Sequence, residues 1–516
     1  MPKKTPTAAV IDIGSSELRL RIAQQVKSEN DPVGIKYLEN LRYPLSLGRD
    51  TFQAGKMSFE KVDKACGIIK NFLNVTQDYG VRKIRTVANT AVREADNMDY
   101  ILDQIKIKTG VDVQVIDDLE EKQLIYKLLT HYASDDLKQS ALMVYIGTGS
   151  IGISLLEDGK MPRTWNNRVG SLRMSELFGQ LQDYTRDFYR LVEEYLAGFI
   201  NQLKSELPEG LMHFIVSGQD VDLIAKLTES NSPADAPLFQ IPRAEFQGLY
   251  NQLKRKTTDR IANDYKLELA RADTLLPAAC IYQNLLNITQ AGHITASRLL
   301  PCDGILFEMI HEKRFTALDK KLVKSTEQSV QLLSQRYNGP EAHSQLVKEY
   351  AIRIFDKIKK IHGLESRDKL LLTAAASLHE IGEYVNLRDH HEHSYALVRG
   401  SDIVGLNYME SEIVALLCRY HSGVTPSIGQ ACYTALSPSD RVRVSKLVAM
   451  LRLADALDHS HTQKYSDIDV KLTDTALIVT IQTGASVSLE QWAFTEKGRF
   501  FEEVFGIKAE LRVKKT

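Results

Sequence analysis

The sequence predicts two α/β lobes in succession, followed by an all-α domain and a small α/β C-terminal tail. A β-branched strand that ends in a Gly/Ser loop occurs twice, at Ala9–Ser16 and at Met143–Ser150, and a second strand follows each copy. Beyond a polar stretch around Thr316–Thr326, long amphipathic helical segments replace the alternation of strands and helices. A chain of 516 residues is too long for one hydrophobic core and predicts about three or four domains.

The first lobe is expected over residues 1–130, where strands and amphipathic helices alternate as in an α/β domain of mixed sheet order. The expected strands are Ala8–Ile13, Leu18–Gln24, Ile84–Ala88 and Val111–Ile116, and the expected helices are Phe59–Tyr79, Tyr100–Thr109 and Glu120–His131. The second lobe is expected over 131–312. Its expected strands are Ala141–Ile146, Gly152–Glu157 and Met212–Val216, and its expected helices are Tyr184–Glu206, Arg243–Tyr250 and Thr258–Asp264.

The helical domain is expected over residues 313–464 because apolar side chains recur there at helical spacing. Its expected helices are Ser344–His362, Asp368–His379, Met409–His421 and Asp440–Leu457. Over 465–516 the pattern returns to short apolar runs typical of strands. These are expected at Ile468–Leu472, Ala476–Gln482 and Phe501–Phe505.

Composition limits the classes of function. The 66 acidic residues nearly cancel the 65 basic residues, so no overall charge favours nucleic acid or a membrane surface. The five cysteines form no C-x-x-C pair, which favours buried thiols in a reducing compartment over disulfides or a thiolate metal site. No apolar run has the length of a membrane span, and the N-terminus lacks a signal-peptide core. We therefore expect a cytoplasmic protein that binds neither nucleic acid nor membranes.

The two Gly/Ser loops are candidate phosphate-binding sites, because glycine lets backbone N–H groups approach an anion closely. Each loop alone is equally typical of an ordinary strand end. The first copy carries Asp12 within its strand, where the second has Tyr145. A third strand followed by glycine occurs at Val216–Gln219. The candidate phosphate-binding residues are Asp12, Gly14, Ser15, Gly147, Thr148, Gly149, Ser150, Ser217 and Gly218.

Four carboxylates between Asp117 and Glu121 lie where a strand passes into a helix. One interpretation is capping, since an aspartate suits the N-cap and acids in the first turn favour the helix dipole. The other is that Glu121 or Glu120 faces a cleft and acts as a general base. Arg93 follows a strand and is a candidate phosphate clamp, with a surface ion pair as the alternative.

Nine of the thirteen histidines lie between His343 and His461, within the expected helical domain. Imidazole and carboxylate groups from several helices are the usual ligands of a divalent metal in a helical bundle. The alternative is that these residues are polar side chains at helix ends and satisfied core positions. The candidate metal ligands are His343, His379, Glu380, His393, His421 and Asp455.

Over nearly its whole length the chain resembles the Ppx/GppA family of exopolyphosphatases and guanosine-pentaphosphate phosphohydrolases. The segments that carry the resemblance are Ile11–Ser16, Ala88–Ala95, Val115–Tyr126, Gly147–Ser150, Ser217-Gly218, Asp303-Gly304, His379–Gly382, His393–Tyr395, Arg419–His421 and Leu451–Asp458. The resemblance implies two actin/hexokinase-like (ribonuclease H-like) lobes with substrate phosphates between them, followed by an HD-like helical domain. It also implies removal of a terminal phosphate from polyphosphate or pppGpp, usually with Mg²⁺, and suggests a homodimer.

By position, the resemblance implies that Glu121 activates the water, that Arg93 clamps a phosphate, and that Asp12, Gly14 and Ser15 belong to one phosphate loop. The order of histidines and acids is similar to that of HD-domain phosphohydrolases, except that Glu380 stands where their signature has aspartate. A divalent metal in the helical domain is therefore a second expected cofactor.

The second loop departs from the family pattern, which usually reads Asp-Ile-Gly-Gly-Gly-Ser-Thr-Glu. Tyr145 and Gly152 replace both acids. Phosphoryl transfer depends on positioning and charge neutralisation, so this loss predicts reduced turnover in the cleft. Three hypotheses stay open: a phosphoanhydride hydrolase acting between the lobes, a regulatory protein that binds an alarmone, nucleotide or polyphosphate without hydrolysis, and a metal-dependent phosphohydrolase acting through the HD-like domain.

Overall fold

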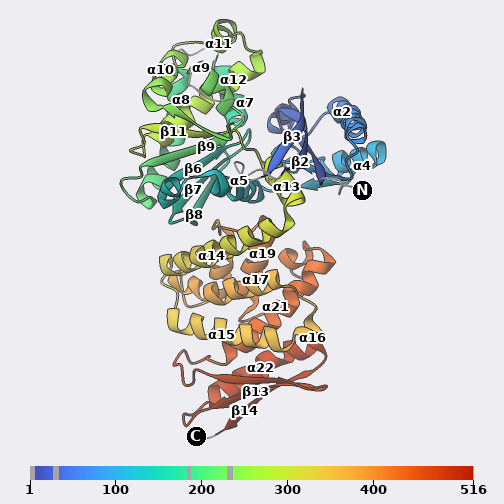
Figure 1. Ribbon diagram of the computed structural model, residues 1–516. Helices are drawn as coiled ribbons and strands as arrows, with labels where there is room; N and C mark the ends of the chain where they lie inside the picture. The colour runs from blue at the N-terminus through green and yellow to red at the C-terminus, as the bar shows by residue number, and fades with distance from the viewer. Residues whose placement is uncertain (1–5, 27–33, 183–186, 229–235, 515–516) are drawn as a thin grey trace. The chain divides into compact units, whose positions relative to one another are not determined.

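The structure is a computed structural model that describes residues 6–26, 34–182, 187–228 and 236–514. The chain forms two compact units, Met1–Leu322 and Val323–Thr516, which are described separately (Figure 1). Within the described ranges, every helix is too short or too polar to cross a bilayer.

The first unit begins with a five-stranded sheet in the order β3-β2-β1-β4-β5. Its strands are β1 (Thr7–Ile13), β2 (Glu17–Gln25), β3 (Ile35–Pro44), β4 (Lys83–Ala88) and β5 (Val113–Val115). The central strand β1 pairs antiparallel with β2 and parallel with β4. Strand β3 was not predicted, because its half-exposed side chains leave no regular apolar alternation.

Helices cover both faces of this sheet. One apolar cluster joins the sheet to α2 (Phe59–Asp78) and α4 (Met98–Thr109). A second cluster joins it to α5 (Asp118–Tyr132) and α13 (Pro301–Ile310). Helix α13 lies so close to α5 that a Cβ atom on Gly304 would be 2.7 Å from the Cβ of Leu124. The chain therefore returns to the first sheet after the second sheet is complete.

The second sheet of this unit has six strands in the order β10-β11-β9-β6-β7-β8. They are β6 (Ser140–Ile146), β7 (Ile151–Glu157), β8 (Lys160–Asn167), β9 (His213–Gly218), β10 (Leu238–Pro242) and β11 (His293–Ser297). Strand β6 is antiparallel to β7 and parallel to β9, as β1 is to β2 and β4. The near-repeat in the sequence therefore corresponds to a repeated strand arrangement.

The helices of the second lobe are α7 (Ser171–Gln182), α8 (Phe188–Glu206), α9 (Val221–Leu227), α10 (Arg243–Leu253), α11 (Thr258–Tyr265) and α12 (Leu269–Leu286). The predicted start of the first long helix, at Tyr184, lies outside the described residues. Helix α12 was missed because most of it is buried, and a helix surrounded by core has no polar face to give a helical period.

The second unit is helical and ends in a small sheet (Figure 1). Its helices include α15 (Glu341–Lys357), α16 (Lys359–His362), α17 (Ser366–Leu378), α18 (His390–Arg399), α19 (Tyr408–Tyr420), α21 (Pro438–Ala456) and α22 (Ser488–Phe505). The sheet has the order β12-β13-β14, from β12 (Ile468–Leu472), β13 (Ala476–Gln482) and β14 (Lys508–Lys514).

Two sequence expectations in this unit were wrong. The segment Phe501–Phe505 ends helix α22 and is no strand, because the aromatic run is one part of a longer amphipathic helix that packs on α21 and β14. The helix expected over Ser344–His362 is interrupted at Ile358, where the backbone leaves the regular helical conformation, and so forms α15 and α16.

Candidate functional site

A polar cleft lies in the first unit, where strands from both sheets end. Strands β1 and β4 contribute Asp12 and Val87 near their carboxyl ends, and β6 contributes Tyr145. The lining residues are Asp12, Gly14, Glu17, Arg19, Val87, Asn89, Ile116, Glu121, Tyr145, Gln219, Leu300 and Pro301. Ligands of α/β folds typically bind at such strand ends.

The two Gly/Ser loops close in the same way. The N–H of Gly14 donates to the carbonyl of Glu17 at 3.1 Å, and that of Gly147 donates to the carbonyl of Ser150 at 2.9 Å. Neither Gly14 nor Gly149 has room for a side chain, since an added Cβ would lie 2.7 Å from the Glu17 carbonyl oxygen and 2.6 Å from Thr90 Cγ2, respectively. The backbone of each loop is thus packed as a close-approach turn.

Glu121 has the environment of a general base. Its side chain is buried, with 4% exposure, and Oε1 has no hydrogen-bond partner among the described residues. Burial raises the pKa of Glu121 to about 8, with a further rise from Asp118 and Asp12 and an opposing effect from Arg93 and Lys122. A buried carboxylate with an unused oxygen and a pKa near neutrality is typical of proton transfer. Burial likewise raises the pKa of Asp12 to about 6.

Arg93 is held in place by Asp118. Its Nη2 donates to Asp118 Oδ1 at 2.6 Å, and its Nη1 donates to the carbonyl of Ile116 at 2.6 Å. The hydroxyl of Ser150, from the second lobe, donates to the same Oδ1 of Asp118 at 3.0 Å. Burial alone would raise the pKa of Asp118, but Arg93, Lys122 and the hydrogen bond from Ser150 outweigh it and lower the pKa. Asp118 is thus an ionised link between Arg93 and the second loop.

Two predicted site residues have other contacts. Glu120 accepts a hydrogen bond from the Gln114 side chain at 3.2 Å and does not line the cleft. The Ser217 hydroxyl is buried and donates to the carbonyl of Leu299 at 2.5 Å. Asp117 is the N-cap of α5, accepting from the N–H of Glu120 at 2.8 Å.

Sequence reasoning missed Asn89 and Gln219, which line the cleft. Each residue directly follows the last residue of a strand, β4 or β9. Because ligands of α/β folds bind at strand ends, this position could have indicated that both residues line the cleft.

The two departures from the family pattern face each other. Tyr145 on β6 and Gly152 on β7 are direct partners in the antiparallel register. A Cβ atom on Gly152 would lie 2.0 Å from Cε and 2.2 Å from Cδ of Lys122. The Lys122 side chain therefore runs through the space that any side chain at position 152 would need.

The cleft residues do not fit a protein-held Mg²⁺, which prefers carboxylate and other oxygen ligands. Among the described residues, those of the cleft provide no three carboxylate, histidine or cysteine ligand atoms within 4.8 Å of one another. Lys122, 4% exposed, adds a positive charge close to Glu121 and lowers the pKa of both Asp118 and Glu121.

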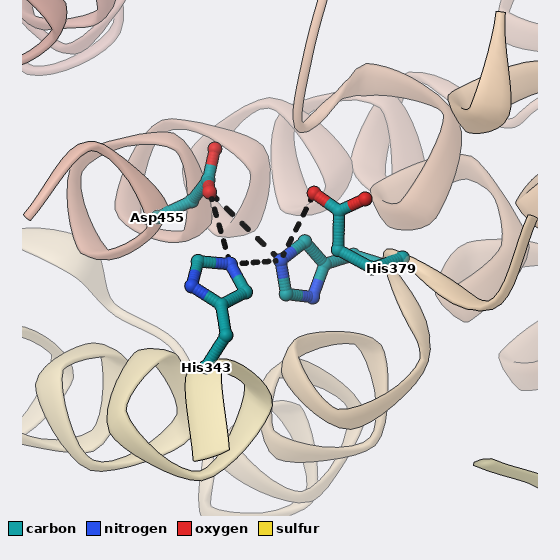
Figure 2. A group of neighbouring side chains, drawn as sticks. His343, His379 and Asp455 are labelled. Carbon is teal, nitrogen blue, oxygen red and sulfur yellow. Dashed lines mark hydrogen bonds and ion pairs between the residues drawn. The ribbon is translucent and has the colours of Figure 1, made fainter. Parts of the chain in front are cut away.

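A separate candidate metal centre lies in the second unit. His343 from α15, His379 and Glu380 after α17, and Asp455 from α21 place ligand atoms within 4.8 Å of one another. Figure 2 shows His343, His379 and Asp455 converging from their separate helices. His343 Nε2 lies 3.2 Å from His379 Nε2 and 3.4 Å from Asp455 Oδ1.

Glu380 also belongs to a second group, with His390 and His421. Its Oε2 lies 3.3 Å from His390 Nε2, and its Oε1 lies 3.4 Å from His421 Nε2. The predicted ligand His393 is in neither group, and His390, three residues earlier and at the start of α18, stands in its place. The run of histidines was the signal, but the register within it depends on where α18 begins.

Backbone and carboxylate contacts orient these imidazoles. Nδ1 of His379 lies 2.9 Å from the Ala376 carbonyl, and Nδ1 of His421 lies 2.7 Å from the Cys418 carbonyl. Hydrogen bonds at Nδ1 leave Nε2 as the lone-pair donor, which is the usual arrangement of metal-bound histidine. Burial lowers the pKa of His379 to about 3, so this ring is neutral at pH 7.

His343 differs from His379 in charge. Its Nδ1 lies 2.9 Å from Asp458 Oδ2. Burial would lower its pKa, but hydrogen bonds to Asp455 and Asp458 outweigh burial and raise the pKa to about 9. A bound cation would therefore displace a proton from this imidazole.

Comparison with known proteins identifies relatives along nearly the whole chain. The family model described as "Ppx/GppA phosphatase family" matches residues 23–313, more than half of the chain, and the model described as "Ppx/GppA phosphatase, domain III" matches residues 326–496. A guanosine-5'-triphosphate,3'-diphosphate pyrophosphatase of Photobacterium profundum is 22% identical over 494 residues, covering 92% of each chain. The protein of the same name from Aliivibrio fischeri is 22% identical over 456 residues, covering 87% of each chain.

Solved structures agree on the fold. An exopolyphosphatase from Cytophaga hutchinsonii has a TM-score of 0.51 at 21% identity, covering 59% of this chain and 98% of its own. A Ppx/GppA family member from Aquifex aeolicus has a TM-score of 0.50 at 19% identity, covering 60% of this chain and 98% of its own.

Proposed function

Because the chain belongs to the Ppx/GppA phosphatase family, we propose that its cleft hydrolyses the terminal phosphoanhydride bond of polyphosphate or of a guanosine pentaphosphate. The buried, unpartnered Oε1 of Glu121 beside two glycine loops is the observation that carries this proposal. The names of the relatives, a guanosine-5'-triphosphate,3'-diphosphate pyrophosphatase and an exopolyphosphatase, support this substrate class.

In the proposed reaction, Glu121 accepts a proton from a water molecule while the water oxygen forms a bond to the terminal phosphorus. The bond between that phosphorus and the bridging oxygen breaks, which releases inorganic phosphate and a substrate one phosphate shorter. Backbone N–H groups of the two loops bind the phosphate oxygens. Arg93 has five N–H donors and gives three hydrogen bonds, to Thr90, Ile116 and Asp118. Its other donors are available to neutralise the developing charge.

Phosphate release by Glu121→Gln tests the proposal. Removing a general base is expected to slow hydrolysis by about 10²–10⁴-fold, while tripolyphosphate binding measured by calorimetry stays close to that of the wild type. Glu194→Gln, an exposed change on α8, is the matched control. Release from Glu121→Gln at the wild-type rate would exclude the mechanism. Tight binding without release by the wild type would favour a regulatory, non-hydrolytic protein.

A second candidate function is a metal-dependent phosphohydrolase in an HD-like second unit. Four imidazoles and the carboxylate of Asp455 lie around Glu380, whose two oxygens contact residues of both ligand groups. A divalent cation held by these residues would activate water for attack on a phosphoester. We propose that His343, His379, Glu380, His390, His421 and Asp455 hold the metal.

Metal content of the purified full chain tests this second proposal. His390→Ala is expected to lower the content, measured by elemental analysis, whereas His393→Ala leaves it unchanged. The opposite result would favour the ligand set expected from the sequence. Metal content that stays at the wild-type level in His379→Ala would exclude the centre.

A further inference from the structure

Lys122, next to the cleft-lining Glu121 in the chain, is a buried charged residue that the proposed mechanism leaves unused. It projects from α5, one turn after Asp118, and its aliphatic part passes over Gly152 on β7. The (i, i+4) spacing on one helix places Lys122 and Asp118 on the same face. Glu121, from the same turn, shares the charge environment, since Lys122 lowers the pKa of Glu121 and of Asp118.

Position 152 and Lys122 exclude each other. An added Cβ at 152 would come within 2.0 Å of Lys122 Cε, and within 2.7 Å of its Cγ. The glutamate that the family pattern has at this position therefore has no room here while Lys122 keeps its conformation. Its register partner, Tyr145, is buried, and burial with the nearby charges of Glu121 and Asp12 keeps the pKa of the phenol well above its usual value. A neutral phenol and a glycine thus occupy the places of two carboxylates.

The net result is an exchange of charge. Two negative ligands are missing, and the ammonium group of Lys122 acts on Asp118 and Glu121. A protein-held divalent cation would be repelled by this ammonium and would lack ligands, whereas a phosphate is attracted by it. Lys122 and Arg93 therefore balance the negative charges of Asp118 and Glu121 without a metal.

We propose that the Lys122 ammonium, beside the cleft, is a resident cation that binds the terminal phosphates of the substrate in place of a protein-held divalent ion. This inference rests on the proposed function, because it assigns the group that neutralises phosphate charge in the same cleft. Lysine binds phosphate as a point charge, through up to three N–H donors. The hydrolysis itself is unchanged, with the proton of water passing to Glu121.

Tripolyphosphate binding to the full chain, measured by calorimetry in excess EDTA, tests the assignment. The wild type is expected to bind, and Lys122→Met to bind at least about tenfold more weakly, because a charge-assisted hydrogen bond is lost. Lys122→Arg keeps the charge and is expected to recover most of the affinity. Lys127→Met removes another buried lysine of α5 and is the matched control for damage to the helix.

A second readout separates an electrostatic role from a merely structural one. Asp12 on β1, Arg93 on α3 (Thr90–Arg93), Asp118 and Lys122 on α5 and Tyr145 on β6 all act on Glu121 or are acted on by it. Removing the lysine charge raises the pKa of Glu121, so the pH at which phosphate release becomes half-maximal is expected to move upward in Lys122→Met and to return in Lys122→Arg.

The same measurement with Mg²⁺ in place of EDTA completes the test. Three results overturn the assignment: wild-type binding that requires Mg²⁺, absence of wild-type binding both in EDTA and in Mg²⁺, or equal affinity of Lys122→Met and wild type in EDTA. Metal-independent, Lys122-dependent binding without phosphate release supports the assignment and refutes the proposed hydrolysis. The two proposals therefore fail separately.

Discussion

Replacing Gly152 by alanine is expected to destabilise the first unit because the new methyl group collides with Lys122. The added Cβ would lie 2.0 Å from Cε of this lysine. A carbon–carbon contact needs about 3.5 Å, so the lysine chain must move by about 1.5 Å within a packed site. Overpacking of this kind typically costs about 1–3 kcal/mol. Urea denaturation of wild type and Gly152→Ala measures the loss in free energy of unfolding.

Shortening the Lys122 side chain should relieve this collision. Lys122→Ala removes the atoms that the new methyl group meets, so the double variant is expected to be more stable than the sum of the single changes predicts. A coupling free energy of about 0.5–3 kcal/mol is typical of residues in contact. Gly198→Ala is the control, since its exposed position on α8 leaves a Cβ in open space. If Gly152→Ala destabilises no more than Gly198→Ala, or if the double variant shows no coupling, the lysine does not occupy this space.

Three other predictions follow from the titration of the two sites and from their ligands. Phosphate release should increase as pH rises through about 8, because Glu121 accepts a proton only when ionised and its pKa is about 8; a rate that falls between pH 7 and pH 9 would contradict this. The raised pKa favours folding fully below the ordinary glutamate pKa of 4.5, and this contribution is lost as pH rises through about 8, so Glu121→Gln should gain stability over the wild type between pH 6 and pH 9 in thermal melts. Chelation with EDTA should lower the melting temperature of the second unit by removing bound metal and leave that of the first unit unchanged. Melts of the full chain followed with one probe in each unit test this, and a lower melting temperature of the first unit alone would contradict it.

Much of the fold was predictable from local patterns. The strands that precede the two loops were predicted within one residue at each end, because buried β-branched runs that stop at glycine have few alternatives. The pairing of Tyr145 with Gly152 follows from the antiparallel register of β6 and β7. A turn that is one residue longer or shorter would have paired other residues. Helix α12 was not predictable, since burial on all sides removes the period that marks a helix.

The candidate sites were less predictable than the fold. Glu121 was named from its place at the start of a helix, but its unpartnered oxygen depends on tertiary packing. Lys122 was passed over because a lysine after acids normally lies on a solvated face, and only the absence of a side chain at Gly152 lets it turn inward. His390 was passed over for His393 because the start of α18 decides which histidines face Glu380.

The two candidate sites handle charge in opposite ways. In the cleft, cationic side chains balance the buried carboxylates, as in the pair of Arg93 with Asp118 at 2.6 Å. In the second unit, imidazole nitrogens and carboxylate oxygens lie within 4.8 Å of one another in each of the two groups, and Lys497 pairs with Asp455. Burial of Glu380 alone would raise its pKa, yet His421 and His379 outweigh burial and lower it, so this acid carries its negative charge without a lysine or arginine partner in the described contacts. Buried anions require a partner of opposite charge. In the cleft, lysine and arginine side chains are these partners, whereas in the second unit a bound cation would provide the partner of Glu380 most directly. We therefore assign metal dependence to the second unit and phosphate binding without a protein-held metal to the first.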